Sequence, residues 1–298
     1  MSDTPTSTHA PRLVRTGEEL DQLRPDLDAV VLVPTMGALH TGHRSLIRQA
    51  REHAGPSGTV VVSIFVNPLQ FGPNEDYAEY PRTLDADLEV CANEGVDVVF
   101  APSVDTMYPD GPGGAMVTVR PGPTGTILEG ATRPGFFDGV LTVVAKLFHL
   151  VRPDAAVFGQ KDAQQLALVR RMVRDLSMPV AIHAADIVRD RDGLATSSRN
   201  VYLSPEERDT ALALSRALRA GRDLAARAAT ATAVRDAADS VLASAAKATP
   251  PLELDYLVLV DPDTFTDVDT DHHGPAVLAV AAWVGETRLI DNMPLHIE

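Results

Sequence analysis

The first 185 residues alternate short runs of β-branched residues with stretches that repeat apolar residues at helical spacing. This alternation is typical of parallel βαβ units, in which a helix connects each strand to the next by a right-handed crossover. The predicted strands are residues 30–33, 59–66, 97–100 and 155–158, and the predicted helices are 41–53, 84–94, 136–151 and 162–176. We therefore predict an α/β fold whose first domain, residues 1–185, is a Rossmann-like, doubly wound parallel sheet.

The pattern changes after residue 185. Ser204 followed by Pro205 and two acidic residues predicts a helix start with serine as the N-cap, and an Ala- and Arg-rich helical region continues to about residue 247. The strands predicted after it are 252–260, 276–284 and 286–290, the last two joined as a hairpin through Gly285. Residues 186–298 are therefore predicted to form a smaller α+β domain.

Composition and charge exclude several classes of protein. A net charge of −15 argues against a nucleic-acid-binding protein, and no apolar run approaches the ~20 residues that span a bilayer. The single cysteine, Cys91, rules out an internal disulfide and suits a reducing cytosol. Residues 1–12 are polar and are interpreted as a mobile tail, not a secretory signal. We expect a cytoplasmic protein without nucleic-acid or membrane partners.

The segment Pro34-Thr-Met-Gly-Ala-Leu-His-Thr-Gly-His43 follows the first predicted strand and opens a helix. It therefore lies at the carboxyl edge of the sheet, where open α/β folds bind ligands. Glycines 37 and 42 allow the backbone to approach a ligand closely, and a helix N-terminus offers N–H groups to phosphate. His40 and His43 share one face of a helical turn and can stabilise charge on a phosphate. The alternatives are a zinc pair, for which Cys91 has no suitable spacing, and two ordinary surface histidines.

A second segment, Gly159-Gln160-Lys161-Asp162, follows a later predicted strand. Only three of the 26 basic residues are lysines, and Lys161 is the one at a helix start, where a compact charge can meet phosphate. Gly159 allows close approach, and Asp162 can accept hydrogen bonds from a ribose, although it can equally be a helix N-cap. This segment suits a nucleotide.

A third segment, Thr196-Ser197-Ser198-Arg199, follows the predicted sheet and is preceded by Val188. Hydroxyls and a guanidinium in one loop suit a triphosphate tail, although serine-rich loops are also common turns. Together with the two histidines, this loop indicates a site that activates carboxylates with ATP.

Five segments in this order resemble the pantothenate synthetase (pantoate–β-alanine ligase) family: residues 34–43, 65–72, 80–83, 158–165 and 196–200. That family is similar in fold to the nucleotidylyl transferases and class I aminoacyl-tRNA synthetases. The resemblance implies ATP-dependent condensation of (R)-pantoate with β-alanine through a pantoyl adenylate, with AMP and pyrophosphate released. It also implies ATP as a substrate, Mg²⁺ on its phosphates, a homodimer, and a C-terminal domain that covers the active site.

The resemblance also assigns roles to individual residues. The catalytic residues would be His43, with His40 and Lys161 as phosphate-binding partners. ATP would contact Met36, Gly37, His40, His43, Gly159, Lys161, Asp162, Val188, Thr196, Ser197, Ser198 and Arg199. Pantoate and β-alanine would contact Met36, Asn67, Gln70 and Gln165. No protein ligand is assigned to a metal, although Asp87 would approach Mg²⁺ or tether Lys161, and Arg133 would reach phosphate or a partner subunit.

Three positions depart from the family pattern. Thr41 stands in place of an acid, Gln160 in place of the usual glutamate, and Thr196 in place of the usual methionine. None removes a proposed contact group, so the effect of these changes on ATP and Mg²⁺ affinity stays open.

Three other functions compete with this one. They are a nucleotidylyltransferase that leaves the nucleotide on its product, a tRNA-charging enzyme, and an inactive nucleotide-binding regulator. A further stretch, residues 261–273, is rich in aspartate, and from Asp267 it begins like a calcium loop but has His272 at the sixth position and Leu278 at the twelfth. We interpret it as a solvated acidic turn.

Overall fold

The computed structural model describes residues 10–72, 77–114 and 116–298, and every statement below concerns these residues. They divide into two compact units, Met1–Phe158 with Leu168–Ala185, and Gly159–Ala167 with Asp186–Glu298. One division falls after Ala185, where the domain boundary was predicted. Gly159–Ala167 group with the second unit because the turn Gln160–Asp162 packs on the last strand of that unit, and the predicted domain ranges 1–185 and 186–298 stay a prediction.

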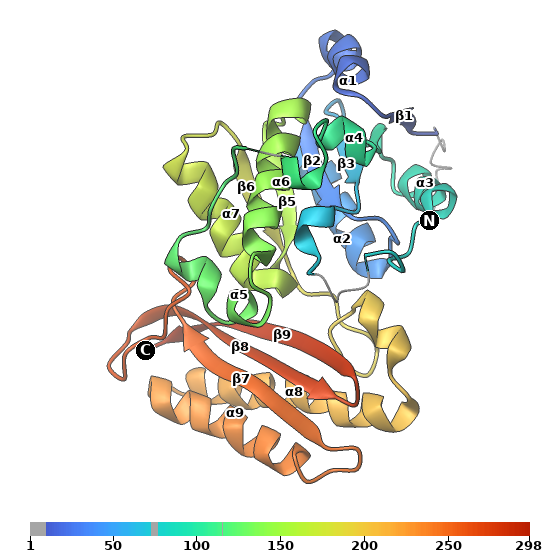
Figure 1. The fold of residues 1–298 in the computed structure, drawn as a ribbon. Coiled ribbons are helices and arrows are strands. Elements are labelled where there is room, and N and C mark those ends of the chain that lie inside the picture. The colour runs from blue at the N-terminus through green and yellow to red at the C-terminus, as the bar shows by residue number, and fades with distance from the viewer. Residues whose placement is uncertain (1–9, 73–76, 115) are drawn as a thin grey trace, which may run out of the picture. The chain divides into compact units, whose positions relative to one another are not determined.

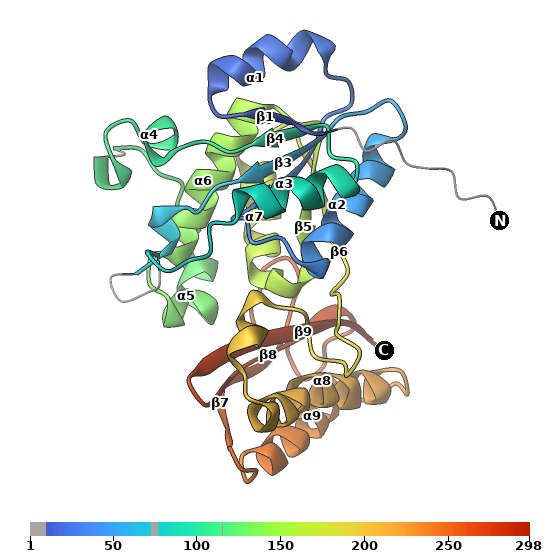
Figure 2. The ribbon, with the colours of Figure 1, turned by 90° about the vertical axis from the view of Figure 1, so that its right-hand side faces the viewer.

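The first unit contains a six-stranded sheet with the order β1-β4-β3-β2-β5-β6 (Figures 1 and 2). Its strands are β1 Arg12–Val14, β2 Val31–Thr35, β3 Val60–Ile64, β4 Val98–Phe100, β5 Ala155–Gly159 and β6 Ala181–Ala185. The chain runs outward from β2 through β3 to β4 and then returns to β5 beside β2. The strand order therefore reverses between β2 and β5, the place where doubly wound sheets bind ligands. The predicted Rossmann-like fold is confirmed.

The four strands predicted for this unit are present to within a few residues, whereas β1 and β6 were missed. The prediction of a tail over residues 1–12 fails at Arg12, which begins β1, and residues 1–9 lie outside the described part of the chain. β6 has the sequence Ala-Ile-His-Ala-Ala, in which alanine and histidine hide the β-branched signal.

Seven helices and four short 3₁₀ turns are described between these strands. The helices are α1 Gly17–Leu23, α2 Thr41–Ala54, α3 Leu84–Asn93, α4 Val104–Met107, α5 Glu129–Thr132, α6 Phe136–Val151 and α7 Ala163–Asp175, the last of which crosses from one unit to the other. The 3₁₀ turns are η1 Arg24–Asp26, η2 Pro68–Gln70, η3 Pro112–Gly114 and η4 Pro123–Thr126. α2 and α3 bury Ile47, Ala50 and Cys91 against alternate valines of β2, β3 and β4, which fixes the start of α2 beside the end of β2.

The second unit packs two helices against a three-stranded antiparallel sheet (Figure 1). The helices are α8 Pro205–Ala225 and α9 Ala231–Ala245, and the strands are β7 Leu252–Val260, β8 Gly274–Val284 and β9 Thr287–Ile297. Leu214, Leu218 and Leu242 of the helices meet Leu278 of the sheet in one core. Two further 3₁₀ turns, η5 Gln160–Asp162 and η6 Ser198–Tyr202, belong to this unit.

Two local predictions for this unit are confirmed and one is too short. Ser204 caps α8 and forms a reciprocal capping box with Glu207, and Gly285 joins β8 to β9 at a φ of 57°. β9 extends well beyond the predicted 286–290, although Pro294 interrupts its N–H groups. That proline is tolerated because β9 lies at the edge of the sheet.

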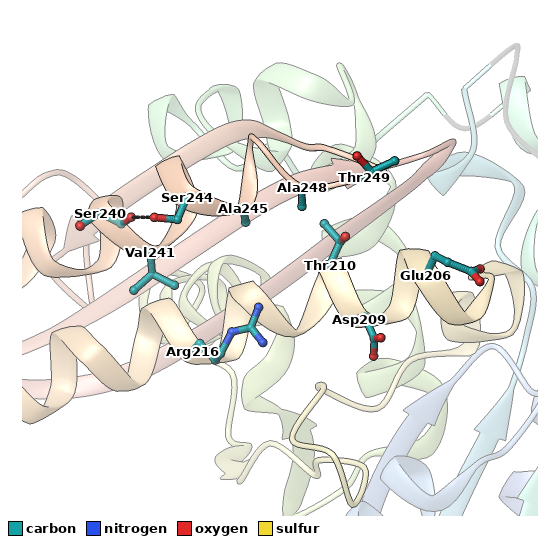
Figure 3. Close-up of a pocket in the computed structure, with 10 residues that line it drawn as sticks. All are labelled: Glu206, Asp209, Thr210, Arg216, Ser240, Val241, Ser244, Ala245, Ala248 and Thr249. Atoms are coloured by element: carbon teal, nitrogen blue, oxygen red, sulfur yellow. Dashed lines mark hydrogen bonds between the residues drawn. The ribbon is translucent and has the colours of Figure 1, made fainter.

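An open depression of about 620 Å³ lies between α8 and α9 (Figure 3). It is lined by Glu206, Asp209, Thr210, Arg216, Ser240, Val241, Ser244, Ala245, Ala248 and Thr249, none of which was predicted to bind a substrate. Among the helices of the described ranges, none is long and apolar enough to cross a membrane.

Candidate active site

The turn between β2 and α2 is held open by a buried carboxylate. Gly37 and Ala38 adopt left-handed conformations with φ of 88° and 50°. Asp87 of α3, only 2% exposed, accepts hydrogen bonds from the backbone N–H of Ala38 at 3.1 Å and of Leu39 at 2.7 Å. Asp87 therefore fixes the predicted nucleotide-binding turn, and its predicted approach to Mg²⁺ or Lys161 stays a prediction.

The imidazole rings of His40 and His43 each accept a hydrogen bond from a backbone N–H group at the first turn of α2. His40 is the N-cap and its Nδ1 accepts from the N–H of Gly42 at 3.1 Å, while Nδ1 of His43 accepts from the N–H of His40 at 3.2 Å. The ring centroids are 4.1 Å apart. A neutral imidazole that accepts at Nδ1 carries its proton on Nε2. This hydrogen-bond network therefore makes both Nε2–H groups donors, which suits developing negative charge on phosphate oxygens.

Gly42 is required by this arrangement. A Cβ at this position would lie 2.8 Å from Cε1 of His40, so any larger residue would displace the ring. The spacing His-x-Gly-His thus has a physical reason that sequence inspection alone did not supply.

Asn67 and Gln70 lie together at the turn η2, which follows β3. The Asn67 side chain is 1% exposed and its Nδ2 donates to Oε1 of Gln70 at 2.9 Å. Oδ1 of Asn67 accepts from the buried hydroxyl of Tyr108 at 2.8 Å. Tyr108 was not predicted as a site residue, because it lies 41 positions away in a stretch without a motif.

Arg133 holds the same turn from another direction. Its Nη2 donates to the carbonyl oxygen of Gln70 at 2.9 Å, and its guanidinium lies 3.8 Å from the ring centroid of Phe136. The structure thus gives Arg133 a local contact, and its predicted reach to phosphate or to a partner subunit stays a prediction.

The loop that carries Lys161 is fixed by β9. Nδ2 of Asn292 donates to the carbonyl oxygens of both Gln160 and Lys161, at 2.9 Å each. Asn292 is 3% exposed, so this clamp is shielded from water. Gly159 precedes it in an extended conformation with φ of −72°, and Gln165 follows as a half-buried residue of α7.

The third predicted segment is a folded turn stabilised by Asp190. The N–H of Thr196 donates to the carbonyl of Val188 at 2.9 Å, and its hydroxyl donates to Oδ1 of Asp190 at 2.7 Å. Oγ of Ser197 accepts from the N–H of Arg199 at 3.3 Å. Thr196, which departs from the family pattern, therefore uses its hydroxyl inside the loop.

The charge at Asp190 is balanced within the second unit. Partial burial raises the pKa of Asp190, but hydrogen bonds from Arg208, Thr196 and Asn200 outweigh it, so the pKa lies below its ordinary value. Nη2 of Arg208 is 2.7 Å from Oδ2 of Asp190, and its Nε is 2.7 Å from Asp192. The loop is thus closed by an ion pair while Ser198 and Arg199 stay exposed.

A partly buried ion pair joins this loop to β9. Nη1 and Nη2 of Arg189 bond to the two carboxylate oxygens of Asp291 at 2.6 and 3.0 Å. Asp291 directly precedes Asn292, the residue that clamps the Lys161 loop. Two adjacent residues of one strand therefore hold two of the three predicted site segments.

Comparison with known proteins identifies the family of this chain. The family model described as "Pantoate-beta-alanine ligase" matches residues 12–294. The chain belongs to this family. A curated relative named pantothenate synthetase, from Thermobifida fusca, is 68% identical over 301 residues and covers 100% of both chains.

Two solved structures of the pantoate–β-alanine ligase family are also similar. A pantothenate synthetase from Thermus thermophilus has a TM-score of 0.85 at 47% identity, covering 95% of this chain and 98% of that one. A pantoate–β-alanine ligase from Francisella tularensis, complexed with β,γ-ATP and β-alanine according to its description, has a TM-score of 0.73 at 32% identity. The latter match covers 95% of this chain and 97% of the other. The predicted family is confirmed.

The structure brings some predicted residues together and places others in different units. Met36, Gly37, His40, His43, Asn67 and Gln70 belong to the first unit, whereas Gly159, Lys161, Asp162, Gln165, Val188, Thr196, Ser197, Ser198 and Arg199 belong to the second. Sequence reasoning missed the supporting residues Tyr108, Arg189, Asp291 and Asn292. No local motif marks them, because each acts through a partner far away in the chain.

The acidic stretch after β7 forms a turn. Oδ1 of Asp261 accepts from the N–H groups of Asp263 at 3.0 Å and Thr264 at 2.8 Å. These bonds lower the pKa of Asp261, with the contribution from Thr264 the largest. The carboxylate therefore stabilises its own turn.

Proposed function

We infer that this chain is an ATP-dependent ligase that condenses (R)-pantoate with β-alanine to form pantothenate, AMP and pyrophosphate. The assignment of pantoate and β-alanine as substrates rests on membership of the pantoate–β-alanine ligase family. The observation that carries the chemistry is the pair His40 and His43, whose Nε2–H groups are donors at the N-terminus of α2.

Activation comes first, because a carboxylate is a poor acyl donor whose leaving group would be oxide. A carboxylate oxygen of pantoate attacks the α-phosphorus of ATP, the bond to the bridging oxygen breaks, and pyrophosphate leaves with that electron pair. The product is a mixed anhydride, pantoyl adenylate. Donors placed around the phosphorus stabilise the charge of the pentacoordinate transition state.

Amide formation follows. The neutral amine of β-alanine attacks the acyl carbon of the adenylate, the bond to the AMP oxygen breaks, and the amine loses one proton. No covalent bond to the protein forms in either step, so no side chain is assigned as a nucleophile.

We propose the following division of labour among the residues. His43, His40 and Lys161 neutralise phosphate oxygens during adenylation. Nucleotide contacts come from Met36, Gly37, Gly159, Asp162, Val188, Thr196, Ser197, Ser198 and Arg199. Gln70, Gln165 and Met36 contact pantoate and β-alanine, and Asn67, which is buried and bonded to Gln70, supports this contact.

We also propose that Mg²⁺ arrives on the triphosphate, where it would neutralise the departing pyrophosphate. Asp87, which the family resemblance places near Mg²⁺, fits a supporting role. Its two carboxylate oxygens accept hydrogen bonds from Ala38, Leu39 and Thr83. The histidines and Lys161 act on the phosphates directly in this proposal.

Assembly and location are further parts of the proposal. Homodimers are expected from the family, and a reducing cytoplasm suits the only cysteine. Burial, with a smaller contribution from Asp87, raises the pKa of Cys91 to about 12, which keeps the thiol protonated and unreactive.

Exchange of labelled pyrophosphate into ATP tests the order of the chemistry. Enzyme with ATP, Mg²⁺ and pantoate should exchange label without β-alanine, because the adenylate can be attacked by pyrophosphate. Addition of β-alanine should then yield AMP and amide in equal amounts. A nucleotidylyltransferase would instead release a stable product that carries the nucleotide, and exchange that strictly requires β-alanine would disprove the stepwise route.

A further inference from the structure

Three polar side chains of the first unit form a directed chain of hydrogen bonds. The Tyr108 hydroxyl bonds to Oδ1 of Asn67 at 2.8 Å, and Nδ2 of Asn67 bonds to Oε1 of Gln70 at 2.9 Å. We propose that Tyr108 is a positioning residue that acts through Asn67 to turn the amide Nε2–H₂ group of Gln70 toward an oxygen of pantoate. This proposal rests on the function given above.

Two backbone groups fix which way the Asn67 amide points. The N–H of Leu69 can only donate, and it lies 3.3 Å from Oδ1. The carbonyl of Gly139 can only accept, and it lies 3.1 Å from Nδ2. A flipped amide would face N–H with N–H and oxygen with oxygen, so these two bonds and the shorter bond from Tyr108 hold one and the same orientation.

The orientation of Asn67 determines the direction of the other two bonds. Tyr108 faces an oxygen that has no proton, so its hydroxyl must donate. Burial raises the pKa of Tyr108, so the phenol keeps the proton that it donates. Gln70 faces an N–H, so its Oε1 must accept. Its Nε2–H₂ group then lies on the other branch of the amide, turned away from Asn67.

The backbone of Gln70 is also held by hydrogen bonds, so the position from which its side chain extends is fixed. Its N–H donates to the carbonyl of Asn67 at 3.1 Å, and its carbonyl accepts from Arg133 at 2.9 Å. Gly139 must be glycine here, since a Cβ would collide with the carbonyl of Leu69. The turn is therefore built around Asn67 from both sides.

A fixed N–H₂ donor suits the oxygen atoms of pantoate. Pantoate presents carboxylate and hydroxyl oxygens, all of which accept hydrogen bonds. The amine of β-alanine must keep its lone pair for attack on the acyl carbon, and a donor facing it would occupy that pair. The Nε2–H₂ group of Gln70 is thus suited to orient pantoate through one of its oxygens, and it leaves the amine of β-alanine free to react.

Tyr108→Phe isolates the hydroxyl. The ring contacts with Phe65, 6.1 Å between centroids, and with Lys146, 5.8 Å from Nζ to the centroid, need no hydroxyl and are kept. The measurement is the KM for pantoate in pyrophosphate exchange without β-alanine, which isolates the first step. Tyr256→Phe in the second unit is the matched control, and the melting temperature of each variant checks the fold.

A double-mutant cycle with Gln70→Ala separates positioning from a general structural effect. In the wild-type background Tyr108→Phe should raise the pantoate KM about 2- to 10-fold, the range of one neutral hydrogen bond, with the ATP KM changed less than about 2-fold. In the Gln70→Ala background the same substitution should change the pantoate KM less than about 2-fold, because the group that it orients is gone.

Two kinds of result would contradict the proposal, and they can be told apart. An unchanged pantoate KM in Tyr108→Phe, or the same increase in both backgrounds, would overturn the positioning role while leaving the ligase function intact. Absence of pantoate-dependent exchange in the unmodified enzyme would instead overturn the proposed function, and the role of Tyr108 with it.

Discussion

Asn292 donates a hydrogen bond of 2.9 Å to the carbonyl oxygen of Lys161, across 131 positions of the chain. Lys161 is thereby held by its backbone, and the proposed function assigns its side chain to a phosphate. The same amide also bonds to Gln160, whose side chain departs from the family pattern. Backbone support by Asn292 does not depend on the side chain at position 160.

Asn292→Ala should slow adenylation about 10-fold, because two carbonyl oxygens lose their shared donor and the loop loses about 1–3 kcal/mol of support. His296→Ala is the control, since His296 is an exposed residue of the same strand. Pyrophosphate exchange and the melting temperature should be measured for both variants. An Asn292→Ala enzyme with unchanged exchange would show that the clamp has no part in placing Lys161.

Lys161→Ala should reduce adenylation by a factor on the order of 10²–10³ without unfolding the protein. This corresponds to a charge-assisted phosphate contact of ~2–4 kcal/mol in the transition state. Lys161→Arg should also be poor, because a planar fork does not replace a compact charge. Lys247→Ala, at an exposed lysine beyond α9, should be neutral. Near-normal turnover in folded Lys161→Ala would refute the assignment.

Gln165→Ala should weaken pantoate binding much more than ATP binding. Its amide can pair with hydroxyl and carboxylate oxygens, and leaving those groups unpaired costs ~1–3 kcal/mol. Isothermal titration with each substrate measures the two affinities separately. Loss of ATP affinity with pantoate affinity retained would mean that the roles are reversed.

Arg208→Gln should destabilise the protein at neutral pH and much less in acid. Hydrogen bonds from Arg208 lower the pKa of Asp192, and at Asp190 they outweigh the opposite effect of burial. A carboxyl with a lowered folded-state pKa adds stability above its ordinary pKa, here 3.8, and loses it as the pH falls through the lower folded-state value.

Urea unfolding at pH 7 and at about pH 3 measures this pH dependence. The gap in stability between wild type and Arg208→Gln should shrink at the lower pH. Arg216→Gln is the control on the same helix, at an exposed arginine. A gap of equal size at both pH values would mean that these ion pairs are not responsible.

The sequence predicts this fold well where apolar periodicity is strong and poorly where partners are remote. The valine-rich strands β2 and β3 and the long helix α6 lie where periodicity placed them, because burial on both faces of a parallel sheet requires such runs. β1 is only three residues long, and β9 carries Asp291, Asn292 and Pro294, which obscure its strand character.

The candidate site shows the same limit. His40 and His43 are recognisable because they follow a strand and open a helix, but the exchange of hydrogen bonds that sets their tautomers depends on coordinates. The supporting roles of Asn292 and Tyr108 could not be predicted from the sequence, because the role of a single polar residue depends on the atoms that it contacts in the folded protein. The sequence therefore suggests candidate substrate-binding groups, but it does not reveal the residues that support them.

The clamp of Asn292 on the Lys161 loop has a consequence for biosynthesis of the chain. A ribosome makes Lys161 long before it makes Asn292. The Lys161 loop of the nascent chain therefore lacks the hydrogen-bond donor of Asn292 while α8, α9, β7 and β8 are made. The sheet of the first unit can pair as soon as β6 is made, whereas the lysine is secured only when the last strand joins β8. The hydrogen bonds from Asn292 to the Lys161 loop therefore form after the sheet of the first unit is complete.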